Sequence, residues 1–177
     1  MDQVTGFHYS ESISYAEKII KETNHIRGGR SYYDAHIYPV LLIGELFMYL
    51  IPKDDRGVVR AALALHDSIE DHRLTYNDVK AVACERVADI VYAVTNEKGK
   101  NRKERANSKY YKGIREVQYA SFVKICDRIH NTADSRLNNS SMYYKYIKET
   151  SNFINSLECE ETEEYTLMFH FLNHLIN

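Results

Sequence analysis

The stretch ALALHDSIEDH, residues 62–72, places polar side chains directly after an apolar run. The spacing of the apolar residues predicts a strongly hydrophobic helix over residues 58–71. Two interpretations of the polar side chains are open: a solvated helix end with exposed acids, or the working edge of a metal site. The side chains in question are His66, Asp67, Glu70 and Asp71.

Helical geometry pairs these four side chains. His66 and Glu70 are four residues apart, as are Asp67 and Asp71, so each pair shares a face one turn apart. The neighbours His66 and Asp67 diverge by about 100° around the helix axis, yet both can reach one ion beside the helix. A lone His-Asp dipeptide carries little information, because this composition gives roughly 0.5 occurrences by chance. A second polar cluster is needed to decide between the two interpretations.

That second cluster lies in KICDRIHN, residues 124–131. Asp127 and Asn131 are four residues apart and therefore share a helix face. An acid beside an apolar stripe needs a partner, because an unpaired buried charge is costly. The apolar stripe consists of Phe122, Val123, Ile125 and Ile129.

Length and composition limit the class of protein. The 177 residues are expected to form one domain over residues 1–177, which can bury about 70% of its unfolded surface. Lys plus Arg number 23 and Asp plus Glu number 25, so the net charge of −2 argues against duplex nucleic acid as the main partner. No run has the length of a signal peptide core or a membrane span, so no membrane partner is expected. The sequence does not indicate an oligomeric state.

The three cysteines, Cys84, Cys126 and Cys159, are an odd number without a CxxC pair. This pattern argues against a disulfide framework and against a zinc ribbon. A reducing compartment fits better, and we expect a cytoplasmic protein.

Two prolines and seven glycines are few for 177 residues, and no window alternates as a strand does, so we predict an all-α fold. Gly28 and Gly29 are expected to break the first helix from the second, because glycine permits backbone angles that other residues resist. Thr75 and Asp78 resemble a capping box. Residues 96–114 are expected to form a basic loop with a helical piece. The expected helices are residues 10–25, 34–50, 58–71, 75–83, 85–95, 116–135, 140–157 and 160–176.

Three motifs occur in a fixed order along the chain: Tyr33-x-x-His36, then His66-Asp67-x-x-Glu70-Asp71, then Lys124-x-x-Asp127-Arg128-x-x-Asn131. This combination resembles the HD-domain phosphohydrolases, and within them the RelA/SpoT-type (p)ppGpp hydrolases, especially their small stand-alone forms. The resemblance runs from about residue 10 to residue 157. It implies an HD-domain helical bundle and a metal-dependent hydrolase that removes the 3′-diphosphate of (p)ppGpp to give GDP or GTP plus pyrophosphate.

The resemblance also implies roles for single residues. Glu70 and Asp71 would position or deprotonate the attacking water. Asn131 would contact the nucleotide, and Tyr146 falls where the stand-alone enzymes place a nucleotide-facing tyrosine. One divalent ion, for which the resemblance favours Mn²⁺, would be held by His36, His66, Asp67 and Asp127. Imidazole and carboxylate ligands are compatible with Mn²⁺.

A polyanionic nucleotide substrate needs cationic side chains to hold its other phosphates. We expect Arg30 and Lys98 to be the substrate-binding cations. Further candidates are Arg27 beside the glycine pair, and Arg102 and Arg105 in the basic stretch.

The chain departs from the family pattern at positions that concern the base and the ribose. The family commonly has Arg-Lys before the first metal-binding histidine, and the nearest text here is Arg27-Gly28-Gly29-Arg30. Two positions after Asn131 the family usually has arginine, and here Ala133 stands. Five histidines match no ligand position of the family: His8, His25, His72, His170 and His174.

Two alternatives to (p)ppGpp hydrolysis therefore remain open. The same machinery could act on another nucleotide, as an NADPH phosphatase or a deoxynucleotide hydrolase. The chain could instead be a non-catalytic nucleotide sensor, although a pure binder would not need the water-activating pair Glu70 and Asp71.

Overall fold

The computed structural model describes residues 6–158 and 160–177, and it describes side chains from residue 9 onward with those of residues 160–162 excepted. Cys159 and the side chain of His8 therefore lie outside the described residues.

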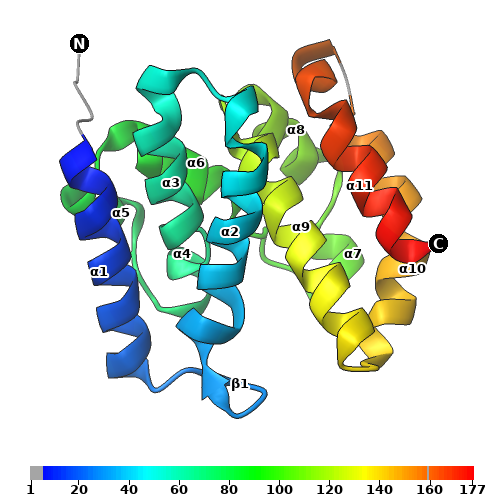
Figure 1. Ribbon diagram of the computed structural model, residues 1–177, viewed down its shortest axis with the longest axis horizontal. Helices are drawn as coiled ribbons and strands as arrows, with labels where there is room; N and C mark the ends of the chain where they lie inside the picture. Colours follow the sequence, from blue (N-terminus) through cyan, green and yellow to red (C-terminus); the bar gives the residue numbers. More distant parts are fainter. Residues whose placement is uncertain (1–5, 159) are drawn as a thin grey trace.

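The described residues form helices joined by short connections, with one small hairpin of two-residue strands (Figure 1), which confirms the predicted all-α class. The α-helices are α1 (Gly6–Thr23), α2 (Tyr38–Phe47), α3 (Arg56–Leu65), α4 (Ser68–Asp71), α5 (Tyr76–Val82), α6 (Glu85–Val94), α7 (Arg102–Arg105), α8 (Ser108–Glu116), α9 (Ala120–Leu137), α10 (Ser141–Leu157) and α11 (Thr166–Ile176). The shorter elements are β1 (Ile26–Arg27), β2 (Arg30–Ser31), the π-helix η1 (Tyr33–Ile37), and the 3₁₀ helices η2 (Met48–Leu50), η3 (Lys53–Asp55) and η4 (Glu160–Tyr165).

Helix α9 lies at the centre of the molecule, with α1 and α11 on opposite sides (Figure 1). It packs against α2, α6, α10 and α11. The side chains of Phe122, Ile125 and Ile129 on this helix are fully or almost fully buried. Burying each such side chain stabilises the fold by about 1.5–3 kcal/mol, so α9 is a firm support for the polar residues that it also carries.

The glycine pair that was predicted to separate the first two helices forms the turn of a tight β-hairpin between α1 and η1. Gly28 and Gly29 have φ angles of +57° and +78°. Two successive residues with positive φ are what a type I′ hairpin turn requires. The turn pairs Arg27 with Arg30 and Ile26 with Ser31 in an antiparallel ladder.

The capping box at the start of α5 is confirmed. The Thr75 hydroxyl accepts a hydrogen bond from the Asp78 backbone N–H, and the Asp78 carboxylate accepts one from the Thr75 backbone N–H. Helix α9 begins later than predicted, at Ala120, because Tyr119 has a φ of +68° and cannot be part of a right-handed helix.

Two predicted helices are divided at the polar motifs, and the helix expected over residues 160–176 begins as the 3₁₀ helix η4 before α11. The helix expected over residues 34–50 begins as the π-helix η1 before α2 continues it. The helix expected over residues 58–71 ends at Leu65 and resumes at Ser68, with His66 and Asp67 between α3 and α4. Hydrophobic spacing did not reveal these divisions, because the apolar stripe continues across both of them.

Among the described residues, no helix combines the length and the apolar character needed to cross a membrane.

Candidate active site

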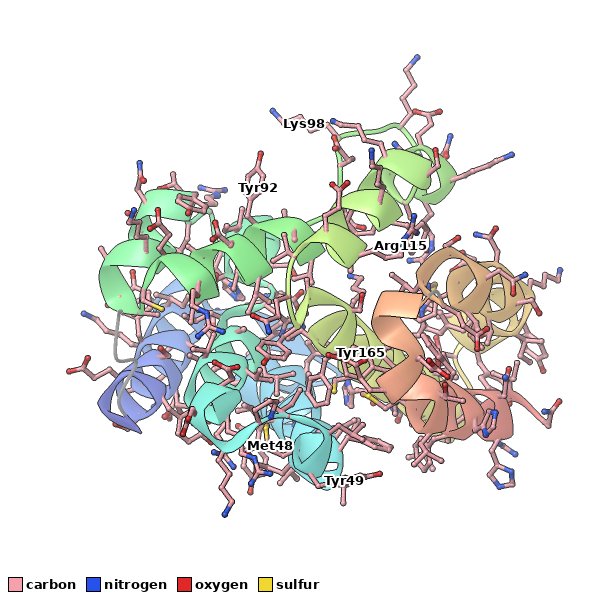
Figure 2. The ribbon with its side chains drawn as sticks, turned by 90° about the horizontal axis from the view of Figure 1, so that it is seen from above. Met48, Tyr49, Tyr92, Lys98, Arg115 and Tyr165 are labelled. Atoms are coloured by element: carbon pink, nitrogen blue, oxygen red, sulfur yellow. The ribbon has the colours of Figure 1, made fainter. Side chains whose placement is uncertain are left out.

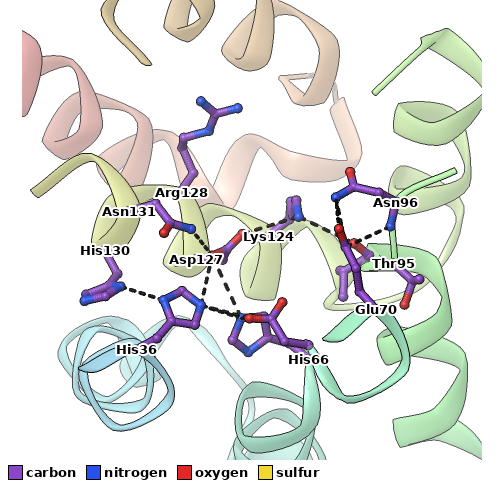
Figure 3. A network of polar contacts seen from close by, with 12 residues as sticks. His36, His66, Glu70, Thr95, Asn96, Lys124, Asp127, Arg128, His130 and Asn131 are labelled. Carbon is purple, nitrogen blue, oxygen red and sulfur yellow. Dashed lines mark hydrogen bonds and ion pairs between the residues drawn. The ribbon is translucent and has the colours of Figure 1, made fainter. Parts of the chain in front are cut away.

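Four polar atoms from three parts of the chain converge beside α9 (Figure 3). Asp67 Oδ2 lies 3.0 Å from His36 Nε2 and 3.1 Å from His66 Nε2, and the two Nε2 atoms are 3.1 Å apart. Asp127 Oδ1 completes the group, at 3.4 Å from His36 Nε2 and 3.9 Å from His66 Nε2. These are the four residues that the sequence motifs predicted as ligands of one ion.

The spacing of these atoms suits one divalent ion. Ligands about 2.1 Å from the same ion lie roughly 3 Å from one another, which is the separation found among His36, His66 and Asp67. Two neutral imidazoles and two carboxylates carry a charge of −2, which balances a divalent cation. Without a cation or added protons, four converging electron pairs would repel one another, so the donor set fits a metal.

Hydrogen bonds on the far side of the histidine rings orient them. His66 Nδ1 lies 2.9 Å from the Leu63 carbonyl oxygen, which can only accept, so Nδ1 carries a proton and Nε2 is the nitrogen that faces the group. His36 Nδ1 lies 2.9 Å from His130 Nδ1 and 3.0 Å from Arg27 Nη1. Burial is the main cause that lowers the pKa of His130 to about 4, and the charge of Arg27 acts in the same direction, so this ring is neutral near pH 7.

Buried carboxylates dominate the electrostatics of the group. Burial by itself lowers the pKa of His66, but the charges of Asp67 and Asp127 outweigh it and raise the pKa to about 9. Burial by itself would raise the pKa of Asp67, but His66 and His36 hold it well below its usual range. Burial acts on Asp127 in the same way, and the Lys124 ammonium and His66 lower its pKa instead. Each group therefore favours its charged form because of its neighbours.

The divided helices bring the ligands together. The wide π turn of η1 carries His36, which is 1% exposed, inward against α9. Such π turns are frequent at functional sites. His66 and Asp67 lie at the interruption between α3 and α4, where Asp67 Oδ2 contacts His66 Nε2 and His66 Nε2 faces Asp127 on α9.

Glu70 and Asp71 lie beside the ligand group, which consists of His36, His66, Asp67 and Asp127. The two acids have different environments. The Glu70 carboxylate accepts hydrogen bonds from the Asn96 side-chain amide at 2.8 Å, and it points toward the start of the basic loop (Figure 3). Burial, then the charges of Asp67 and Glu70, raise the pKa of Asp71. A carboxylate with a raised pKa accepts a proton more readily than a solvated one, which suits a general base.

Three of the four converging side chains, His36, Asp67 and Asp127, line a cavity of about 500 Å³. The same cavity is lined by Glu70, Asp71, Asn131 and Tyr146. The cavity is polar and electrostatically asymmetric. The region of α4 contributes only acids and α7 contributes only cations, whereas α9 and α10 each contribute charges of both signs. The cations that line it are Arg102, Lys103, Arg105, Lys124, Arg128 and Lys148.

A buried arginine connects α9 to α10 at this cavity. The Arg128 guanidinium lies over the rings of Tyr146 and Phe153, at 4.8 Å and 4.6 Å from their centroids. It also forms an ion pair of 3.2 Å with Glu149, which holds Arg102 through two further hydrogen bonds of 3.0 Å and 2.9 Å. These contacts hold Tyr146 in the cavity wall.

The structure places the predicted substrate-binding cations differently from the other site residues. Arg30 is exposed in β2 and does not line the cavity. Lys98 is exposed and projects away from the body of the molecule (Figure 2), so it does not line the cavity either. Substrate contact by these two residues stays a prediction without support from the geometry.

The cation of the hairpin that does reach the site is Arg27. Its guanidinium donates to Asn131 Oδ1 at 3.1 Å and pairs with Asp134 at 2.8 Å. Sequence reasoning named Arg27 but favoured Arg30. The hairpin register distinguishes the two residues, and that register is not visible in the residue types.

Comparisons with known proteins agree with this geometry. No family model matches the chain. The chain is similar to guanosine-3′,5′-bis(diphosphate) 3′-pyrophosphohydrolase MESH1 of Drosophila melanogaster, with 31% identity over 84 residues, and of Danio rerio, with 34% identity over 80 residues. These matches span 48% and 45% of this chain and 46% and 44% of the relatives, so the chain covers about half of their length.

A solved structure of a metazoan ortholog of SpoT, which hydrolyses ppGpp and plays a role in starvation responses, matches with a TM-score of 0.72. The match covers 95% of this chain and 93% of that chain at 18% identity, which shows a shared fold. The resemblance to the stand-alone (p)ppGpp hydrolases is confirmed. This chain shares the HD-type helical bundle of that group.

Proposed function

We propose that the protein is a metal-dependent hydrolase that removes the 3′-diphosphate of (p)ppGpp and releases GDP or GTP and pyrophosphate. We also propose that residues 1–177 act as a single HD-type hydrolase domain and that Mn²⁺ is the resident ion. The observation that carries this proposal is the convergence of His36, His66, Asp67 and Asp127 at a cavity that also holds a group of cations.

The chemistry follows from the donor set and the acids beside it. When bound, a divalent ion lowers the pKa of a water molecule and offsets the charge that develops on phosphoryl oxygens. Asp71, with its raised pKa, takes the proton of the attacking water. Glu70, held by Asn96, orients that water. The water oxygen forms a bond to the phosphorus that is attached to the 3′ oxygen. The bond between this phosphorus and the 3′ oxygen breaks, and the nucleoside 3′ oxygen takes up a proton.

The rest of the cavity holds the remainder of the nucleotide. A (p)ppGpp molecule carries a second phosphate chain at its 5′ end, and the cations of α7 and α10 lie in the same cavity as the ligand group. Ion pairs and charge-assisted hydrogen bonds to phosphate are the strong ones in a site of this kind. Asn131 and Tyr146 line the cavity and are the candidates for contacts with the ribose and the base.

The test is an assay of the purified protein with Mn²⁺ and ppGpp. We expect equimolar release of GDP and pyrophosphate, and loss of turnover in Glu70→Gln and Asp71→Asn at unchanged Mn²⁺ content. The matched control is Asp89→Asn, which should leave the rate unchanged. Asp89 accepts a hydrogen bond from the Tyr76 hydroxyl outside this cavity. Release of single phosphate, or no release while Mn²⁺ is demonstrably bound, would contradict the proposal.

One observation favours a second candidate substrate. At the position two residues after Asn131 the chain has Ala133, and Arg27 is occupied by Asp134 and Asn131. Ribose and base recognition therefore differ from the family pattern, whereas the ion site does not. An NADPH phosphatase would release phosphate and a deoxynucleotide hydrolase triphosphate, so one panel of ppGpp, NADPH and dNTPs distinguishes these activities. A protein that binds the metal but hydrolyses none of these nucleotides would instead be a non-catalytic nucleotide sensor.

We further propose a cytoplasmic protein. Cys84 and Cys126 are free thiols, and Cys126 is fully buried. Free thiols suit a reducing compartment.

A further inference from the structure

The residues that flank the two hairpin strands form an aromatic pair that the motifs do not include. His25 and Tyr32 flank the β1–β2 ladder, and the Tyr32 backbone N–H donates to the His25 carbonyl at 2.9 Å. Their rings stack with centroids 3.9 Å apart and planes 6° apart. Cross-strand aromatic pairs of this kind stabilise a hairpin. The Gly28-Gly29 turn thereby fixes where the Tyr32 ring lies.

A second histidine ties this pair to the metal-site segment. His25 Nδ1 lies within hydrogen-bonding distance, 3.2 Å, of His72 Nε2. His72 is buried and follows α4 directly, with its backbone N–H donating to the Ser68 carbonyl. The hairpin and the segment from Asp67 to His72 are therefore held in a fixed relation, although they are far apart in the sequence.

The Tyr32 hydroxyl reaches the metal site itself. It donates a hydrogen bond of 2.6 Å to Asp67 Oδ2, the oxygen that also faces both histidine Nε2 atoms. The Tyr32 side chain is only 7% exposed and lines the cavity, and its ring lies 5.0 Å from the His36 ring. Burial and the charge of Asp67 raise the pKa of Tyr32, which keeps the hydroxyl protonated as a donor.

We infer that Tyr32 is a positioning residue that holds the Asp67 carboxylate in the orientation needed to bind the divalent ion, with His25 and His72 as its support. The inference rests on the metal site of the proposed function, and it adds a residue outside the Tyr33-x-x-His36 motif. A free carboxylate rotates about its terminal bond. A short hydrogen bond from a buried, stacked tyrosine removes that freedom before the ion arrives.

Removing only the hydroxyl tests this role. Tyr32→Phe keeps the ring on His25, and we expect its dissociation constant for Mn²⁺ to rise about 10-fold or more, since groups that orient metal ligands typically contribute 10- to 100-fold in affinity. The measurement is titration with MnCl₂ followed by electron paramagnetic resonance of the free ion. The matched control is Tyr76→Phe, which removes a 2.8 Å tyrosine–carboxylate hydrogen bond to Asp89 outside the cavity and should leave the constant unchanged.

A positioning role also predicts how activity changes. In Tyr32→Phe the Mn²⁺ concentration for half-maximal rate should rise in proportion to the dissociation constant for Mn²⁺. His25→Ala, which keeps the hydroxyl and removes its support, should weaken Mn²⁺ binding in the same direction by a smaller factor. An equal loss in Tyr76→Phe, or wild-type Mn²⁺ affinity in Tyr32→Phe, would overturn the inference.

This experiment separates the inference from the proposed function. If ppGpp is not hydrolysed but Tyr32→Phe binds Mn²⁺ weakly and Tyr76→Phe binds it normally, the positioning role stands and the substrate assignment falls. If ppGpp is hydrolysed and Tyr32→Phe has the wild-type constant, only the positioning role falls. A wild-type chain that binds no Mn²⁺ would overturn the positioning role and the metal dependence together.

Discussion

At the scale of single residues, the sequence motifs predicted which side chains converge, because those side chains are defined by residue type and order. His36, His66, Asp67 and Asp127 indeed converge. The residues that hold them could not be predicted in this way. Tyr32 reaches Asp67 through a hairpin register, and residue types alone do not show which of two adjacent tyrosines points inward.

Ligand and water-activating residues should respond differently to mutation. Asp127→Ala removes a ligand from α9 and leaves Lys124 without its 3.3 Å ion-pair partner, so we expect the purified variant to lose Mn²⁺. Glu70→Ala should retain Mn²⁺ and lose at least about 100-fold in turnover, the typical contribution of a positioned acid or base. Metal analysis by mass spectrometry beside the ppGpp assay measures both. Equal Mn²⁺ content in wild type and Asp127→Ala would contradict the ligand assignment.

Mn²⁺ binding should depend on pH because the ion competes with a proton on His66. Asp67 and Asp127 raise the pKa of His66 to about 9 in the metal-free protein, against 6.5 for an unperturbed histidine. A raised pKa stabilises the metal-free fold most below pH 6.5, and this contribution is lost as the pH rises through 9. Mn²⁺ affinity should therefore increase with pH up to about 9, by at most tenfold per unit for one released proton. Calorimetry in buffers of different ionisation enthalpy would count that proton, and a pH-independent affinity would refute the competition.

At the scale of elements, hydrophobic spacing predicted where the helices lie but not where they are divided. The spacing across residues 58–71 is that of one helix, whereas the chain interrupts it at His66 and Asp67. The Thr75 cap was predictable because a capping box is a local contact between nearby residues. The divisions depend on packing against α9, which no local pattern encodes.

Replacing either of two glycines by alanine should change the free energy of unfolding, in opposite directions at the two positions. Gly29 has a φ of +78°, so Gly29→Ala should lower the free energy of unfolding by about 1 kcal/mol, and it should weaken Mn²⁺ binding by loosening the hairpin that carries Tyr32. Gly113 lies within α8 with nothing within 4 Å of an added Cβ, so Gly113→Ala should raise the free energy of unfolding by about 0.5–1 kcal/mol. Urea denaturation and Mn²⁺ titration measure both effects. Equal stability changes in the two variants would contradict the turn assignment.

At the scale of the whole molecule, the cavity joins the ligand group to the cations of α7 and α10. Arg102 connects these two elements through its paired hydrogen bonds to Glu149. Composition could not predict this asymmetry, because the net charge of −2 averages acids and bases that the fold separates. The basic stretch was predicted as a source of substrate-binding cations, and its residues Arg102 and Arg105 do line the cavity.

Removing one cavity cation should affect substrate binding more than chemistry. For Arg102→Ala we expect KM for ppGpp to rise about 10-fold, since a hydrogen bond to a charged group contributes roughly 1.5–3 kcal/mol, with kcat changed less than threefold. Lys109→Ala, which removes an exposed lysine paired with Glu97 outside the cavity, should leave both constants unchanged. Steady-state kinetics at fixed ionic strength decides the matter. A matching rise of KM in Lys109→Ala would show a general charge effect rather than a contact in the cavity.

The proposed metal site is tested most directly by locating the bound ion. Crystals grown with MnCl₂, with anomalous diffraction recorded on either side of the manganese absorption edge, would show where Mn²⁺ binds. We predict one strong anomalous peak within about 2.5 Å of His36 Nε2, His66 Nε2, Asp67 and Asp127 together. A peak that lies elsewhere, or no peak at saturating MnCl₂, would contradict the central claim that these four side chains hold a single ion.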